Sequence, residues 1–297
     1  MMRRSIILMV LILAASVFRT PAPAHAAPYL GLKPPGTTPR IFAPRVVSTG
    51  NLIHSRLAIS PDGHEMFWNT VDTTTFSTRL RSIQEVGGRW TEPQSPPFAG
   101  PGSSQLPMFA PDGSRLYFRV RAEKEWTTTF LEKLASGWSA ARGEGALLQC
   151  GSSFTRSGRV YFSSAMNTKT WNTGIFSARL SPDGYSDIVP LDSTINVPNA
   201  IDYTPWVSPD ESFLLFSSNR PLVGDQEDMH VHVSFRAADG TWSTPRRVSD
   251  IRGRFPSVSP DGRYLFFCGD DGNFYWTDAR IIDALRPAQD AGAVKPR

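Results

Sequence analysis

The chain has 297 residues, with 31 lysines and arginines against 27 acidic residues and a net charge of +4. Three of the arginines (Arg3, Arg4 and Arg19) lie in an N-terminal segment that resembles a secretory signal, and without them the balance is 28 basic to 27 acidic residues. A chain so close to neutrality lacks the basic surface that a nucleic-acid-binding protein needs.

The N-terminal segment has the three parts of a signal peptide. Arg3 and Arg4 precede an apolar run over residues 6–18, and Ala24-His25-Ala26 matches a small-x-small cleavage site. The run is too short for a stable membrane span, and no later segment is apolar enough to form one. The sequence therefore predicts a signal peptide over residues 1–26 and a periplasmic or secreted protein.

A four-residue turn motif recurs five times in the rest of the chain. It reads Ser60-Pro61-Asp62-Gly63, Ala110-Pro111-Asp112-Gly113, Thr155-Arg156-Ser157-Gly158, Ser208-Pro209-Asp210-Glu211 and Ser259-Pro260-Asp261-Gly262. Its third positions (62, 112, 157, 210 and 261) are separated by 50, 45, 53 and 51 residues, and an aromatic-rich stretch follows each copy. A regular period of this length indicates a repeat architecture.

Each motif predicts a hairpin, because Pro presets the first turn position and Gly adopts the left-handed conformation that closes the turn. A second turn signal follows about half a repeat later, with predicted strands between the two signals at 75–80, 127–131, 174–180 and 230–235. Two hairpins per repeat form a four-stranded blade. We therefore predict an all-β, five-bladed β-propeller, with six blades as the alternative, and expect Trp90, Trp138 and Trp242 to be buried between blades.

The fifth repeat lacks a fourth strand and continues into a helical stretch at residues 278–285. Residues 41–48 resemble the outer strand of the fourth repeat (242–249), with Pro, Arg, Val and Ser in register. We expect this N-terminal strand to complete the fifth blade and close the ring, which removes two open sheet edges. The predicted domains are a signal peptide (1–26), a β-propeller (27–286) and a disordered C-terminal tail (287–297).

The turn motif followed by an aromatic strand resembles the Pro-Asp-Gly, WD-repeat-like propeller repeats of the TolB-like family. The resemblance covers about residues 40–286 and is clearest at 203–236 and the following Asp239-Gly240-Thr241-Trp242. Ser157 and Glu211 depart from the motif. The resemblance implies a periplasmic or secreted bacterial propeller with a binding or scaffolding role, although fold analogy alone does not determine function.

We expect the functional site at the axial mouth, where the inner strands begin and converge. Counting back from each turn motif places a set of polar residues there: His54, Arg56, Gln105, Gln149, Asp202, Tyr203 and Arg254. Converging polar groups around an aromatic residue are typical of a ligand site. In the alternative interpretation these residues pair with one another, for example Asp202 with Arg254 or Arg56.

The residue patterns favour binding over catalysis. The chain has no G-x-S-x-G nucleophile motif, and the mouth has one carboxylate, Asp202, where a glycosidase needs two. We predict a non-catalytic scaffold that binds an envelope protein or a glycan, as a monomer without a cofactor, nucleic-acid partner or membrane span. The alternatives are a five-bladed glycosidase and a small-ligand sensor with a closed apolar pocket.

The metal-binding patterns are weak. His230 and His232 share one face of a strand but have no third ligand nearby in sequence, so we expect them to pack rather than bind metal. The acidic residues Asp225, Glu227 and Asp228 lack the ligand spacing of a calcium loop. Cys150 and Cys268 are predicted to lie two blades apart, so we expect free thiols instead of a disulfide.

Overall fold

The computed structural model describes residues 28–122, 125–145, 150–166, 173–181, 184–220 and 228–288. The predicted signal peptide and residues 289–297 of the predicted tail therefore lie outside the described residues. Within these ranges, none of the helices is long and apolar enough to cross a membrane.

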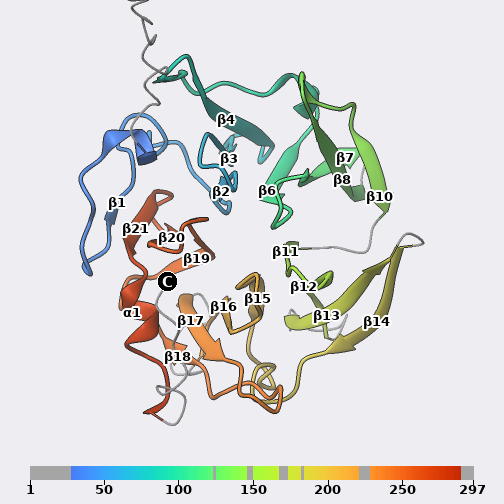
Figure 1. The fold of residues 1–297 in the computed structure, drawn as a ribbon, viewed down its shortest axis with the longest axis vertical. Coiled ribbons are helices and arrows are strands. Elements are labelled where there is room, and N and C mark those ends of the chain that lie inside the picture. The colour runs from blue at the N-terminus through green and yellow to red at the C-terminus, as the bar shows by residue number, and fades with distance from the viewer. Residues whose placement is uncertain are drawn as a thin grey trace, which may run out of the picture.

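The predicted repeats form five antiparallel sheets arranged as a ring of blades (Figure 1). Blade 1 consists of β2 (Ala58–Ile59), β3 (Glu65–Val71), β4 (Thr78–Val86) and β5 (Arg89–Trp90). Blade 2 consists of β6 (Ser104–Phe109), β7 (Arg115–Ala122), β8 (Glu125–Leu134) and β10 (Arg142–Gly145), and β9 (Gly137–Trp138) also pairs with β8. The prediction of an all-β, five-bladed propeller is confirmed.

The remaining blades follow the same order from the axis outward. Blade 3 consists of β11 (Cys150–Phe154), β12 (Arg159–Ala165), β13 (Thr173–Ser181) and β14 (Gly184–Pro190). Blade 4 consists of β15 (Asp202–Val207), β16 (Phe213–Ser218), β17 (His230–Phe235) and β18 (Arg246–Arg247). Blade 5 consists of β19 (Gly253–Val258), β20 (Tyr264–Gly269), β21 (Phe274–Asp278) and β1 (Arg40–Ile41). The short helices are η1 (Pro28–Gly31), η2 (Pro97–Ala99) and α1 (Arg280–Asp283).

The turn motif connects the first two strands of every blade as its chemistry predicts. In the first copy Gly63 has a φ of 78° and its N–H donates to the Ser60 carbonyl at 2.8 Å. The Asp62 carboxylate accepts hydrogen bonds from the Ser60 hydroxyl and the His64 N–H, and these bonds lower the pKa of Asp62 although partial burial opposes them. The aspartate therefore stabilises the turn in its ionised form.

Glu211, which departs from the motif, connects two blades. It occupies the glycine position with a φ of 59°, a conformation that costs a non-glycine residue free energy. Its carboxylate contacts Arg159 of blade 3 at 3.2 Å and Arg236 of blade 4 at 2.9 Å, and also accepts a hydrogen bond from Tyr161. These bonds across the interface between the two blades offset the backbone strain.

A second repeated feature joins the inner strands to their neighbours. β6, β15 and β19 each contain a bulge in which the third residue has a positive φ: Leu106, Thr204 and Phe255. The N–H of that residue donates to a small polar side chain in the second strand of the preceding blade. The three acceptors are Asn69, Ser163 and Ser217 respectively. These buried polar groups are therefore satisfied between blades.

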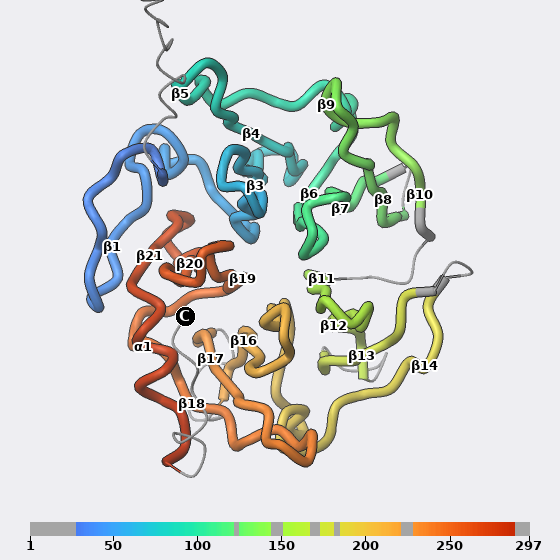
Figure 2. The backbone as a smooth tube through the Cα atoms, viewed as in Figure 1, coloured from blue at the N-terminus to red at the C-terminus, as the bar shows by residue number. Residues whose placement is uncertain are grey.

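The N-terminal strand pairs with the third strand of the last blade, but it is shorter than predicted. Arg40 pairs with Trp276 and Ile41 with Tyr275, so β1 is the outermost strand of the fifth sheet (Figure 2). The predicted strand over 41–48 is therefore wrong in extent. Residues 43–48 instead form a compact turn, in which the N–H groups of Val46, Val47 and Ser48 all donate to the Ala43 carbonyl.

The three predicted interface tryptophans differ in burial. Trp242 is buried and packs edge-on against Tyr161 of blade 3, with ring centroids 6.1 Å apart. Trp138 also contacts the preceding blade, since its Nε1 donates to Glu65 at 3.1 Å, but it is only half-buried. Trp90 is half-buried as well. The prediction that all three are largely buried is confirmed for Trp242. Trp90 and Trp138 lie in two-residue outer strands at the rim, where they are partly exposed but still pack against buried core residues.

Candidate functional site

Arg56 lies at the centre of the ring and not on its surface. It precedes β2, and its side chain is 4% exposed. Its guanidinium donates to the carbonyls of Ser152 (2.7 Å) in blade 3, Pro205 (2.6 Å) in blade 4 and Pro256 (3.1 Å) in blade 5. One cation therefore links the inner strands of three other blades.

The bulges explain why carbonyls are available at this point. Ser152, Pro205 and Pro256 occupy the position after the residue with positive φ in their strands, where the backbone leaves the regular ladder. The Arg56 guanidinium also contacts the Met108 sulfur at 3.6 Å in blade 2. Burial lowers the pKa of Arg56 to about 9, so it remains charged at neutral pH. The Arg56 side chain therefore lies at the centre of the ring, between the two ends of the inner strands.

Aromatic packing organises the mouth, the end at which the inner strands begin. The Phe255 ring lies edge-on to His54, with centroids 4.5 Å apart, and to Tyr203, with centroids 6.0 Å apart. Part of the His54 side chain is exposed to solvent, but most of its surroundings are protein. The resulting desolvation, together with the Arg254 charge, lowers the pKa of His54 to about 4. The His54 imidazole is therefore neutral at physiological pH.

Charged residues at the mouth pair in a way that the sequence analysis did not anticipate. Asp202 is fully buried, and its carboxylate accepts hydrogen bonds from Arg220 at 2.6 Å and from the Val197 N–H at 3.3 Å. Burial raises the pKa of Asp202 although Arg220 opposes the shift. Arg254 lies 3.4 Å from Asp270. The alternative pairing of Asp202 with Arg254 or Arg56 is wrong, because Asp202 pairs with Arg220, Arg254 pairs with Asp270, and Arg56 donates to backbone carbonyls.

The predicted mouth set is therefore divided by depth. His54, Gln105, Tyr203 and Arg254 are exposed or half-buried at the mouth, whereas Arg56 and Asp202 are buried below it. Gln149 lies outside the described residues. Phe255, which holds His54 and Tyr203, was missed. Its repeat position gave a signal, since an apolar residue precedes proline there in Leu106-Pro107 and Phe255-Pro256.

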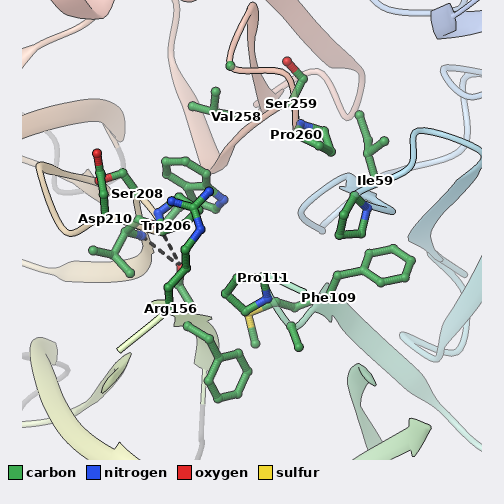
Figure 3. A pocket seen from close by; sticks show the side chains of 18 of the residues that line it. Ile59, Phe109, Pro111, Arg156, Trp206, Ser208, Asp210, Val258, Ser259 and Pro260 are labelled. Carbon is green, nitrogen blue, oxygen red and sulfur yellow. Dashed lines mark hydrogen bonds between the residues drawn. The ribbon is translucent and has the colours of Figure 1, made fainter. Parts of the chain in front are cut away.

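The opposite end of the inner strands has a pocket of about 430 Å³, which we call the cup. Apolar side chains line it, among them Ile59, Phe109, Trp206 and Val258, together with the turn prolines and Arg156 (Figure 3). The site predicted from the sequence was the mouth alone, and the cup was not predicted. The signal was the turn motif itself, whose prolines recur at one position of the repeat and must converge at the axis just as the strand starts do.

The two histidines of β17 are buried, at 3% exposure each. Asp228 lies 3.0 Å from His230, and the Nδ1–H of His232 donates to the His230 carbonyl at 3.1 Å. Within the described ranges, the acidic, histidine and cysteine side chains form no cluster of three that could hold a metal. Cys268 is a buried free thiol whose pKa burial raises to about 12, and the side chain of Cys150 is not described.

No protein-family model and no curated protein matches the chain. Among solved structures it is similar to TolB from Agrobacterium tumefaciens, with a TM-score of 0.51 and 18% identity over 76% of this chain and 73% of that one. A gluconolactonase from Xanthomonas campestris has a TM-score of 0.47 and 15% identity, covering 87% of this chain and 98% of that one. The similarity to TolB supports the propeller fold alone, and the gluconolactonase carries no argument for this chain.

Proposed function

We propose that this protein is an exported, non-catalytic β-propeller that binds a partner at the mouth. The observation that carries the proposal is the state of Asp202. A catalytic carboxylate has to reach the substrate, whereas Asp202 is fully buried and held by Arg220. The glycosidase alternative therefore loses the one mouth carboxylate on which it rested.

The residues that remain accessible suit binding. Tyr203 and His54 offer ring faces and polar edges, Gln105 offers an amide, and Arg254 supplies a cation already oriented by Asp270. The neutral His54 imidazole can donate one hydrogen bond and accept another, and its protonation state does not change near neutral pH. This mixture of aromatic and polar groups fits a protein loop or a glycan.

The location follows from the N-terminal sequence. The predicted signal peptide supports export to the periplasm or beyond, and we expect the partner to be an envelope protein or a glycan and the propeller to be a monomer. The propeller fold shared with TolB is consistent with this assignment but does not decide it.

The experiment is a pull-down from envelope extract with three forms of the exported protein: the natural chain, Tyr203→Ala with Arg254→Ala, and Arg89→Glu as an exposed control on the outer strand of blade 1. A partner held by the natural chain and the control but lost by the double variant supports the mouth. Equal retention by all three moves the site elsewhere. Hydrolysis of a glycoside that disappears in Asp202→Asn would establish the glycosidase instead.

A further inference from the structure

The cup has one irregular member in its rim of turn residues. Pro61, Pro111, Pro209 and Pro260 line it from four of the turn motifs. In the third motif the same position is Arg156, and Ser157 replaces the aspartate that follows. The third turn therefore places a cation where the other four turns have a proline, and it lacks the acidic group that follows each of those prolines.

Among the described residues, the side chain of Arg156 has no partner. Its backbone N–H donates to the Pro209 carbonyl at 2.9 Å, which fixes the turn against blade 4. Within the described part of the chain its guanidinium has no hydrogen bond or ion pair, although it is exposed and lies along the cup beside Trp206 (Figure 3). The third turn is therefore held against blade 4 through its backbone, while its guanidinium has no described partner.

A second cavity of about 440 Å³ continues from the cup. It is lined by residues of blades 2 and 3, including Tyr117 and Leu180, and shares Ala110, Pro111, Phe154 and Arg156 with the cup. Its other arginine, Arg115, is already paired with Glu132 at 3.2 Å. Arg156 therefore stands where the cup meets a groove between the two blades.

The acidic residues around Arg156 limit what can bind. Asp261 is paired with Arg263 at 2.6 Å, but Asp112 in the groove and Asp210 in the cup have no cation within ion-pair distance among the described residues. Hydrogen bonds within their own turns lower the pKa of both carboxyls, so both are ionised at neutral pH. A ligand with several negative charges would be repelled on either side of Arg156.

We propose that the cup and groove form a second binding site, for an extended peptide segment that carries a single acidic side chain. An apolar or aromatic residue of the peptide fills the cup, its aspartate or glutamate pairs with Arg156, and the chain continues between blades 2 and 3. The cavities extend on both sides of Arg156, so a segment that passes through fits better than a chain end. This site lies across Arg56 from the mouth and is independent of it.

The test starts from a random heptapeptide library displayed on phage and selected on the exported protein. The enriched peptides are expected to have one Asp or Glu within two positions of an aromatic or aliphatic residue. The best peptide is then synthesised, and its affinity is measured by fluorescence anisotropy for the natural chain and for Arg156→Glu. We expect at least tenfold weaker binding to the variant, and recovery of binding when the acidic residue of the peptide is changed to Lys.

Three controls make the result specific. Arg89→Glu has the same charge change on the far rim of blade 1 and should bind the peptide as the natural chain does, and so should Tyr203→Ala with Arg254→Ala. Melting curves check that Arg156→Glu is folded. The proposal would be overturned if the library yields no motif above uncoated beads, or if Arg156→Glu changes the affinity of the best peptide by less than twofold. Neither outcome would affect the proposed mouth site.

Discussion

The two ends of the inner strands have different chemistry although the same repeat builds both. At the mouth, charged residues form ion pairs with one another. Examples are the buried pair of Asp202 and Arg220 and the pair of Arg254 and Asp270. At the cup, four turns have proline at one position, and the third turn has Arg156 there, without a side-chain partner among the described residues. A charged residue at the mouth is thus often a packing element, whereas the guanidinium of Arg156 at the cup has no partner among the described residues.

Arg56 separates the two ends. It is a buried cation whose described partners are carbonyls and a thioether, whereas Arg156 is an exposed cation without a described side-chain partner. A side chain with satisfied hydrogen bonds stabilises the ring, and one without them is available to a ligand. Each prediction below tests one part of this contrast, in order of decreasing effect.

The largest effect is expected when residues 28–48 are deleted. The contrast between two ends requires a closed ring, and we propose that β1 closes it. The deletion removes the pairing with β21 and the buried side chains of Tyr29, Phe42 and Val47. Because replacing one buried Phe by Ala costs about 3–5 kcal/mol, we expect the truncated protein to lose cooperative thermal unfolding. Phe42→Ala is the milder companion, and a truncated chain that melts at the parental temperature contradicts closure.

Arg56→Met should be the most damaging single change on the axis. The thioether chain retains the apolar stem but leaves the carbonyls of Ser152, Pro205 and Pro256 without their donor. Each unsatisfied buried group costs about 1–3 kcal/mol, so we expect a loss of about 4 kcal/mol in denaturant unfolding. Arg56→Lys keeps the charge but lacks the planar fork of donors that a guanidinium has, so its loss of unfolding free energy should be smaller than that of Arg56→Met. A loss below 1 kcal/mol for Arg56→Met would show that the bulges hold the axis without it.

Acid should destabilise the mouth half of blade 4. Desolvation lowers the pKa of the buried His232 from 6.5 to about 4, so its contribution to stability is complete above pH 6.5 and is lost as the pH falls toward 4. The shift corresponds to about 3 kcal/mol. His232→Phe retains a ring against Phe216, and we expect its unfolding free energy to decline less than that of the natural chain over this interval. If the unfolding free energies of the natural chain and of His232→Phe decline equally over this interval, His232 is not the group responsible.

The blades could be predicted from sequence because their signals are local. Pro, Asp and Gly determine a turn within four residues, and aromatic strands follow it directly, so the period of the repeat predicted five sheets. β17 has the predicted limits of 230–235, whereas β4 starts at Thr78 instead of residue 75, because the Asp72 carboxylate holds the N–H groups of Thr74 and Thr75 in a turn.

The pairings at the mouth could not be predicted because they join separate strands, loops and blades. Arg220 reaches Asp202 from beyond the end of the neighbouring strand, and the carbonyl partners of Arg56 are about 100 to 200 residues away. The bulges that present those carbonyls depend on hydrogen bonds between blades. The cup, in contrast, was accessible to sequence reasoning through its repeated prolines.

The smallest effect on stability is expected at Arg156, in contrast to Arg56 on the same axis. Arg156→Glu keeps the backbone N–H that bonds to Pro209, removes no described side-chain partner, and changes an exposed residue. Surface substitutions of this kind alter unfolding free energy by about 0.5 kcal/mol or less. We therefore expect Arg156→Glu and the natural chain to unfold at the same denaturant concentration within that margin. A loss of 2 kcal/mol would mean that Arg156 stabilises the third turn, as Arg56 stabilises the ring, and would remove the distinction between the two ends.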